Sequence, residues 1–279
     1  MLAIRPERIL RRIFPSISRL TFNPILKFIG YITDLPLRYL YREFRYLPPN
    51  YMRTRVGVGN RFINNQIHYL NAAKNFWLYV FSVYQISLDS KIVDLGCGCG
   101  RYAHHMRDYW SAGSFFSGEY VGVDIDSDMI GWCGKHFDNR FRFHLSTDPS
   151  SSYNRDVLKS EIYKIPEPDS AFDIVFSASL FTHLLEEQLK NYLRETYRLL
   201  KPGGIGHHSL FFIEFKPITY GSRHTFTYRV GNAYVESLYQ PEAAVAYESV
   251  YILDIASTIG FSEARILKGE IQSILFLRK

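Results

Sequence analysis

The residues with the clearest chemical potential lie in one short run of the 279-residue chain. The string IVDLGCGCGR, at residues 92–101, leads from an apolar stretch into three glycines at alternate positions. Glycine at such a place allows a sharp turn and lets a ligand approach the main chain closely. A helix that begins after the loop would offer free N–H groups to a carboxylate or a phosphate. The string therefore predicts a ligand-binding loop between a strand and a helix.

The acid Asp94, just before the glycines, narrows the kind of ligand. Dinucleotide-binding loops usually read G-x-G-x-x-G, whereas Gly96, Gly98 and Gly100 give G-x-G-x-G. A carboxylate repels a pyrophosphate and attracts an ammonium or a sulfonium group. The pattern favours a cofactor that carries an amino acid, and it disfavours a nicotinamide oxidoreductase.

The string VDLGCGCGR resembles the first motif of the class I S-adenosylmethionine-dependent methyltransferases. Three further strings resemble later motifs of that family in the right order: GVDID, FDIVFSASLFTHL and LLKPGGI. The resemblance covers residues 60–279. It implies a methyltransferase that uses S-adenosyl-L-methionine and has a Rossmann-like α/β fold.

The resemblance also implies roles for individual residues. The glycine loop would wrap the methionine part of the cofactor, with the acid near its amino end. Asp124 would hold the ribose hydroxyls, Ile125 would cover the adenine, and Asp148 would lie near the adenine amino group. The implied cofactor-binding residues are Asp94, Gly96, Cys97, Gly98, Gly100, Asp124, Ile125, Asp148 and Ser177.

A narrower likeness concerns the acceptor. The strings YLPPNYMRTRVG, FTHLLEEQLKNYLRETYRLLKPGG and PEAAVAYESVYILDIASTIGF resemble a bacterial methyltransferase subgroup. Members of that subgroup are associated with the biosynthesis of glycans and other cell-surface molecules. The resemblance implies O-methylation of a sugar or another hydroxylated small molecule, including a lipid-linked sugar.

A hydroxyl acceptor needs a base, because its proton must leave. His183, which follows the fourth predicted strand, is the first candidate, and Glu214, at the end of the fifth, is the second. Both residues also have a structural interpretation; His183 would then pack or cap the start of the next helix. His207 and His208 lie early in the fifth strand, where alternation sends only one of them inward, and we interpret both as structural.

Two irregular segments, residues 147–170 and 216–241, are expected to contact the acceptor. Both follow predicted strands, and open α/β sheets bind ligands beyond the carboxyl ends of their strands. Their aromatic, basic and polar residues suit a sugar or a phosphorylated acceptor, and they suit a solvated loop equally well: Tyr153, Asn154, Arg155, Tyr220, Arg223, His224, Tyr228 and Arg229.

The elements that position these residues follow from hydrophobic periodicity and turn signals. Strands and helices alternate, which predicts a doubly wound, mostly parallel sheet covered on both faces. Residues 264–267 and 271–277 should form an antiparallel hairpin at the sheet edge. Strands are predicted at 91–95, 120–124, 141–145, 172–177 and from the Pro-Gly-Gly turn to residue 215, and helices at 60–86, 101–110, 127–137, 186–200 and 242–259.

The basic charge is concentrated before the methyltransferase-like region. We expect a basic extension at residues 1–59 and a methyltransferase domain at residues 60–279. Residues 1–60 carry eleven Lys or Arg against three Asp or Glu, and the rest carries twenty-two against twenty-four. No apolar run in the extension reaches the ~18–20 residues of a membrane span. Three interpretations stay open: an arm packed on the body, an amphipathic element on an anionic membrane, or an organellar transit peptide.

Other function classes are disfavoured. Three cysteines, two of them inside the glycine loop, argue against a disulfide framework and against zinc, and they indicate a reducing cytoplasm; we expect no metal. If the extension binds membrane, the protein would lie at the inner face of that membrane.

Methyltransferases of nucleic-acid amino groups typically carry D/N-P-P-Y/F after the fourth strand, where residues 177–181 read SASLF. A nucleic-acid methyltransferase and a non-catalytic cofactor-binding module remain the alternatives.

Overall fold

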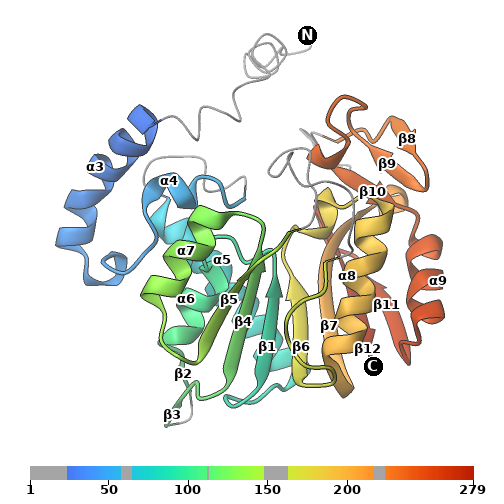
Figure 1. Ribbon diagram of the computed structural model, residues 1–279, viewed down its shortest axis with the longest axis horizontal. Helices are drawn as coiled ribbons and strands as arrows, with labels where there is room; N and C mark the ends of the chain where they lie inside the picture. The colour runs from blue at the N-terminus through green and yellow to red at the C-terminus, as the bar shows by residue number, and fades with distance from the viewer. Residues whose placement is uncertain (1–23, 58–64, 112, 148–162, 216–223) are drawn as a thin grey trace. The chain divides into compact units, whose positions relative to one another are not determined.

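Figure 1 shows the computed structural model, which describes residues 24–57, 65–111, 113–147, 163–215 and 224–279. The chain divides into two compact units, residues 1–76 and residues 77–279. We call them the N-terminal unit and the sheet unit. Helix α5 (Gln66–Tyr84) crosses the division.

Five parallel strands form the centre of the sheet unit. In spatial order they are β5 (Phe141–Leu145), β4 (Glu119–Asp124), β1 (Lys91–Leu95), β6 (Phe172–Ser177) and β7 (Leu200–Phe212). Their carboxyl ends meet at one edge (Figure 1). The predicted parallel sheet is confirmed.

An antiparallel hairpin completes the sheet, as predicted. Strand β12 (Ser273–Arg278) runs antiparallel to β7, and β11 (Glu263–Leu267) pairs with β12 at the edge. The helix before this hairpin, α9 (Ser249–Ile259), ends at Gly260, whose φ of 110° is a left-handed conformation that favours glycine.

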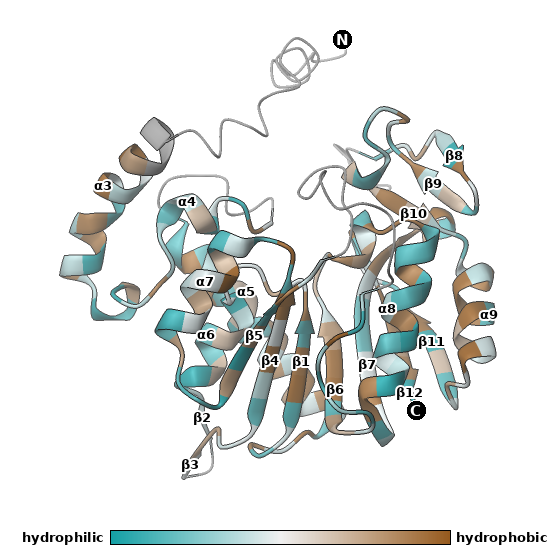
Figure 2. Cartoon of the chain, in the orientation of Figure 1, coloured by the Kyte–Doolittle hydropathy of each residue, from teal (hydrophilic) through white to brown (hydrophobic). Residues whose placement is uncertain are grey.

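Both faces of the sheet are buried. Alternate residues of each strand point to opposite sides, so each face has its own set of packed side chains. Val93, Val121 and Val175 belong to the hydrophobic core shared with α8 (Glu186–Leu199) and α9. On the opposite face Tyr120 and Phe176 contact Trp77 of α5, at ring-centroid distances of 6.5 and 5.4 Å. Figure 2 shows these strands with many hydrophobic residues. The helices α6 (Arg101–Arg107) and α7 (Ser127–His136) follow β1 and β4.

A small antiparallel extension lies at the carboxyl end of β7. Strands β8 (Tyr228–Val230) and β9 (Ala233–Val235) form a hairpin, and β10 (Val245–Tyr247) joins β9 to Phe211 and Phe212 of β7. The prediction of a helix from residue 242 was therefore wrong. The Val-Ala-Tyr run suits a strand with partners on both sides, and the helix begins only at Ser249.

Three other predicted boundaries shift. The helix after the glycine loop ends at Arg107, and Trp110–Ser111 (β2) pairs with Ser114–Phe115 (β3) instead. The fifth strand already starts at Leu200, with a register irregularity against β6, and ends at Phe212. The helix predicted from residue 60 is described from Gln66, and residues 58–64 lie outside the described residues.

The N-terminal unit is built on short helices around a buried ion pair. It contains α3 (Pro24–Leu40), a 3-10 turn η1 (Arg42–Phe44) and α4 (Asn50–Arg53). The Asp34 carboxylate of α3 accepts hydrogen bonds from Arg53, Arg38 and Gln66. Among the helices of the described residues, none is long and apolar enough to cross a membrane.

Candidate cofactor and active site

The glycine loop has the backbone that its sequence predicts. Gly96, Gly98 and Gly100 all have positive φ, at 78°, 54° and 74°, a region that other residues rarely adopt. The amides of Gly96 and Cys97 donate to the carbonyl of Val123 at 2.7 and 3.0 Å. These bonds fix the loop over the end of β4.

Close packing is a second reason why two of these positions require glycine. A Cβ on Gly96 would lie 3.1 Å from Cβ of Leu180, and a Cβ on Gly100 would lie 3.1 Å from the Phe137 ring. The contact with Leu180 also brings the segment after β6 against the loop. The two halves of the predicted site, the glycine loop and the region of His183, therefore lie together.

Cys97 fills space beneath the loop. A Cβ on Gly122 of β4 would lie only 2.8 Å from the Cys97 sulfur, so the strand needs a glycine there. Burial raises the pKa of the Cys97 thiol well above its ordinary value. The thiol is therefore protonated and serves as packing. All three cysteines are buried, and none of them forms a disulfide bond.

Asp124 lies where β4 meets the loop. One oxygen of its half-buried carboxylate accepts from the amide of Gly98 at 2.7 Å, and the other accepts from the amide of Asp126 at 2.9 Å. Both oxygens of the carboxylate thus accept from backbone amides at the rim of the loop. Ile125 follows it and is half-buried.

Asp94 is completely buried below the loop. Its Oδ2 accepts from the hydroxyl of Tyr120 at 2.5 Å, while its Oδ1 has no hydrogen-bond partner within the described structure. Burial raises the pKa of Asp94 to about 7, against the opposing hydrogen bond from Tyr120 and the charge of Arg101. The loop thus rests on a carboxyl group that titrates near neutral pH.

Arg101, the first residue of α6, is a site residue that the sequence reasoning missed. Its Nη2 donates to the Tyr102 hydroxyl at 3.2 Å, and its buried Nε has no partner in the described part of the chain. Its positive charge lowers the pKa of Asp94 in opposition to burial. An arginine directly after the last glycine was the available signal.

Ser177 does not face the loop. It is buried, and its Oγ lies 3.0 Å from Nδ1 of His208, whose Nε2 lies 3.2 Å from Oγ1 of Thr196 in α8. His207 is buried against the other face, with Nδ1 2.7 Å from the Tyr84 hydroxyl. The expectation that only one of the two histidines turns inward was wrong, because both faces of the sheet are covered.

His183 lies in a short 3-10 helix, η3 (Phe181–His183), after the carboxyl end of β6. Its Nδ1 is 2.8 Å from the carbonyl oxygen of Glu242. A carbonyl only accepts, so Nδ1 carries the proton and Nε2 is the basic nitrogen of the neutral ring. The ring is exposed, yet the protein around it removes enough water to lower the pKa of His183, against the bond to Glu242. The ring is therefore neutral at pH 7.

The backbone before His183 is held in a rare conformation. Ser179 has a φ of 70°, its amide donates to Oγ of Ser209 at 2.7 Å, and its carbonyl accepts from Oγ1 of Thr182 at 2.7 Å. Strained residues cluster at functional sites, where the surroundings over-determine them. This turn was not detectable in the sequence, since serine gives no signal for a positive φ.

Glu214 caps a helix. It lies in the 3-10 turn after β7, and its Oε1 accepts from both the amide and the hydroxyl of Ser249 at the start of α9. Asp148 lies outside the described residues, as do Tyr153, Asn154, Arg155, Tyr220 and Arg223. Of the other proposed acceptor contacts, His224 stacks on Phe226, and Tyr228 and Arg229 are exposed on β8.

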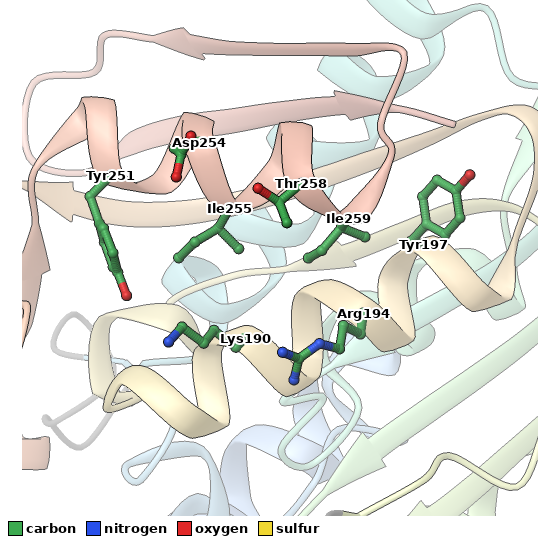
Figure 3. Close-up of a pocket in the computed structure, with 8 residues that line it drawn as sticks. All are labelled: Lys190, Arg194, Tyr197, Tyr251, Asp254, Ile255, Thr258 and Ile259. Carbon is green, nitrogen blue, oxygen red and sulfur yellow. The ribbon is translucent and has the colours of Figure 1, made fainter.

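A separate surface groove of about 560 Å³ runs between α8 and α9 (Figure 3). It shares no residue with the predicted site. The groove is lined by Lys190, Arg194, Tyr197, Tyr251, Asp254, Ile255, Thr258 and Ile259.

Among the described residues no group of three or more His, Cys, Asp or Glu could hold a metal ion.

The central part of the sheet unit matches a known family. Residues 92–204 match the family described as methyltransferase domain, and this stretch contains the glycine loop, Asp124 and His183. The family expected from the motifs is thereby supported, and the match specifies no acceptor.

Two curated relatives align with part of the chain. An arsenite methyltransferase of Aquipseudomonas alcaligenes is 31% identical over 117 residues, covering 41% of this chain and 30% of the relative. A sterol 24-C-methyltransferase of Gibberella zeae is 28% identical over 116 residues, covering 41% and 26%. The chain spans less than a third of the length of either relative.

A solved structure shares the fold of this chain. A Pyrococcus horikoshii protein superposes with a TM-score of 0.52 at 18% identity, covering 81% of this chain and 97% of that one. The Rossmann-like α/β fold with an antiparallel edge is therefore shown by both the topology and this likeness.

Proposed function

We propose that this protein is an S-adenosylmethionine-dependent methyltransferase that binds its cofactor at the glycine loop. The observation that carries the proposal is the combination of a left-handed glycine loop with Asp124 at its rim and the half-satisfied Asp94 beneath it. The family match over residues 92–204 supports the same activity.

The residues of the loop fit this cofactor chemically. The buried Oδ1 of Asp94 has no hydrogen-bond partner in the described chain, and a cation above the loop would favour its ionised form. Asp124, at the end of β4 beside the loop, would accept from ribose hydroxyls, and Arg101 would attract a carboxylate. The proposed cofactor-binding residues are Asp94, Gly96, Cys97, Gly98, Gly100, Arg101, Asp124, Ile125 and Asp148. Ser177 would support the site from below without binding the cofactor directly, because its hydroxyl is bonded to His208.

S-adenosylmethionine, when bound, supplies an electrophilic methyl group. The protein must then align an acceptor and take up its proton. His183 is suited to that task, because its tautomer leaves Nε2 unprotonated and its lowered pKa keeps the ring neutral. Glu214 is the weaker candidate, since one of its oxygens already caps α9. We propose O-methylation of a sugar or another hydroxylated small molecule in the cytoplasm.

Cofactor binding is the first test. Isothermal titration calorimetry of the purified protein should show binding of S-adenosylmethionine and of S-adenosylhomocysteine. Binding of NADH in their place, or no binding of any of the three, contradicts the proposal. Binding without methyl transfer to any acceptor would support the non-catalytic alternative.

The acceptor and the base are tested together. Methyl-labelled cofactor should label hydroxylated sugars and lipid-linked sugars; label only in DNA or tRNA would instead identify a nucleic-acid methyltransferase. With an acceptor in hand, His183→Ala should lower kcat by about 10²–10⁴-fold. His136→Ala is a matched control, because His136 is also exposed with Nδ1 bonded to a backbone carbonyl, at 2.8 Å, but lies in α7. Equal effects of the two changes would exclude His183 as the base.

A further inference from the structure

Helix α3 of the N-terminal unit reverses the usual arrangement of an amphipathic helix, in which the apolar side faces the protein and the polar side faces solvent. Among its residues 28–40, the buried positions are Gly30 and Asp34, and Asp34 is held there by hydrogen bonds from Arg53, Arg38 and Gln66. The helix therefore contacts its own unit through a polar surface. Figure 2 shows hydrophobic residues along much of its length.

The apolar side chains of α3 and of the turn after it are exposed. Phe28 is 63% exposed, Tyr39 85% and Leu40 70%. Single exposed apolar residues are normal, but a contiguous apolar patch marks an interaction surface. The patch, which we call the α3 face, comprises Phe28, Ile29, Tyr31, Ile32, Leu35, Tyr39, Leu40, Tyr41 and Tyr46.

The charge near the α3 face indicates which kind of binding partner the face suits. Arg42 and Arg45 are exposed beside it, against one exposed acid, Glu43, and residues 1–60 carry eleven basic against three acidic residues. A second copy would bring the same positive charge to a symmetric contact. Residues 61–279, with twenty-two basic and twenty-four acidic residues, are nearly neutral and offer little attraction. An anionic lipid surface complements both the charge and the apolar side chains.

We propose that the α3 face lies in the interface of an anionic membrane, parallel to the membrane plane. Amphipathic helices with cationic flanks bind in this way, with their apolar face at the boundary between headgroups and acyl chains. Tyrosines are favoured at this depth, and the face carries four: Tyr31, Tyr39, Tyr41 and Tyr46. The polar anchor at Asp34 would hold the helix with these side chains outward.

Co-sedimentation with vesicles tests the proposal on the full-length protein. Vesicles of phosphatidylcholine and phosphatidylglycerol in equal parts should recruit it at low salt, and binding should fall steeply as salt rises. Pure phosphatidylcholine vesicles should recruit little. Each cation contributes about fivefold to binding, so the double variant Arg42→Glu/Arg45→Glu should bind at least about 25-fold more weakly.

The apolar part of the face has its own variants. Ile32→Asn/Leu35→Asn should lower vesicle binding by about tenfold or more. Both residues are exposed, at 47% and 42%, so the fold should be retained. Matched controls remove equivalent groups from the sheet unit: Val250→Asn and Ile271→Asn, exposed by 73% and 65%, for the apolar pair, and the exposed Lys135→Glu for charge. These controls should leave vesicle binding unchanged.

Three results would overturn the inference. One is the absence of binding to anionic vesicles at low salt. Another is a dimer that Ile32→Asn/Leu35→Asn dissociates while vesicle binding is unaffected, because the occupant would then be a second copy. The third is loss of cofactor affinity or folding in that variant without any vesicle binding, because the sheet unit would then cover the face. Cofactor binding is measured separately, so failure of this inference and failure of the proposed function are distinguishable.

Discussion

Asp34 in the N-terminal unit and Asp94 in the sheet unit are both buried, at 2% and 0% exposure, yet their surroundings differ. Both oxygens of Asp34 are bonded, to Arg53, Arg38 and Gln66. Burial by itself raises the pKa of Asp34, but Arg53 and Arg38 outweigh it and hold that pKa below its ordinary value. Asp94 has one bonded oxygen and one without a partner in the described chain, and its pKa is raised to about 7.

The difference separates a structural carboxylate from a binding one. A buried charge that is fully paired fixes the position of the elements around it. A buried carboxyl group with a free oxygen costs folding energy, and a cationic ligand recovers that cost. We therefore expect changes at Asp34 to affect folding and changes around Asp94 to affect binding.

The largest effect is expected at Asp34. Asp34→Ala leaves Arg53, which is 0% exposed, as an unpaired buried charge, and this should destabilise the N-terminal unit by about 3–5 kcal/mol. Hydrogen exchange of the α3 and α4 amides measures the change. Asp254→Ala on the exposed side of α9 is the control and should stay within about 0.5 kcal/mol. Unchanged exchange in Asp34→Ala would show that the ion pair does not position α3.

Asp124 should have the next largest effect, on binding. Asp124→Ala removes the acceptor for the amide of Gly98 and the expected partner of the ribose, so the affinity for S-adenosylmethionine and S-adenosylhomocysteine should fall by about 1–3 kcal/mol. Calorimetry measures both ligands, with Asp254→Ala again as the control. A full-affinity variant would remove Asp124 from the proposed site.

Asp94 should make binding depend on pH. Its folded pKa of about 7 lies above the ordinary 3.8, so the group is largely neutral below pH 7 and ionised above it. A cationic cofactor prefers the ionised form; affinity should rise through about pH 7 and level off above, by about tenfold if binding lowers this pKa by one unit. Asp94→Asn should abolish the pH dependence measured by calorimetry.

The raised pKa of Asp94 has the opposite effect on folding stability, which it makes lower at higher pH. The unfolded carboxyl ionises near 3.8 and the folded one near 7, so the contribution of Asp94 to stability should decrease as the pH rises between these values. The buried His207 and His208, whose pKa values burial lowers to about 4 and about 3, contribute in the opposite direction, so the comparison is between wild type and Asp94→Asn. Asp94→Asn should lack that decrease in urea unfolding. A variant that unfolds like Asp34→Ala would contradict the distinction between the two aspartates.

Glu186, a partly solvated carboxylate, should have the smallest effect. Hydrogen bonds from Lys190 and Tyr251 lower its pKa to about 2, below the ordinary 4.5. Its contribution is therefore complete above pH 4.5 and is lost as the pH falls toward 2. Because solvent screens the group, Glu186→Gln should cost under about 1 kcal/mol in urea unfolding at about pH 6 and nothing at about pH 2. Glu187→Gln, its more exposed neighbour, should cost less.

The glycine loop and most of the sheet were predictable from the sequence alone. The alternate glycines need left-handed backbone, and apolar runs of about five residues between helical stretches can only bury themselves as parallel strands covered on both faces. The motif order also placed Asp94, Asp124 and His183 at the carboxyl edge. These features follow from local chemistry and short spacing.

The tertiary structure decided what the partners of those residues are. Only the fold shows that Tyr120 satisfies one oxygen of Asp94, that Ser177 faces His208, and that Glu214 caps α9. The strand at Val245–Tyr247 likewise depends on β7 and β9, which lie far away in the sequence or on the other side of an irregular segment. Periodicity records which residues are apolar but not which neighbour receives them. For the same reason the sequence showed that residues 1–59 are basic and mixed with apolar side chains, while the packing of α3 through Asp34 determined which of its sides faces outward.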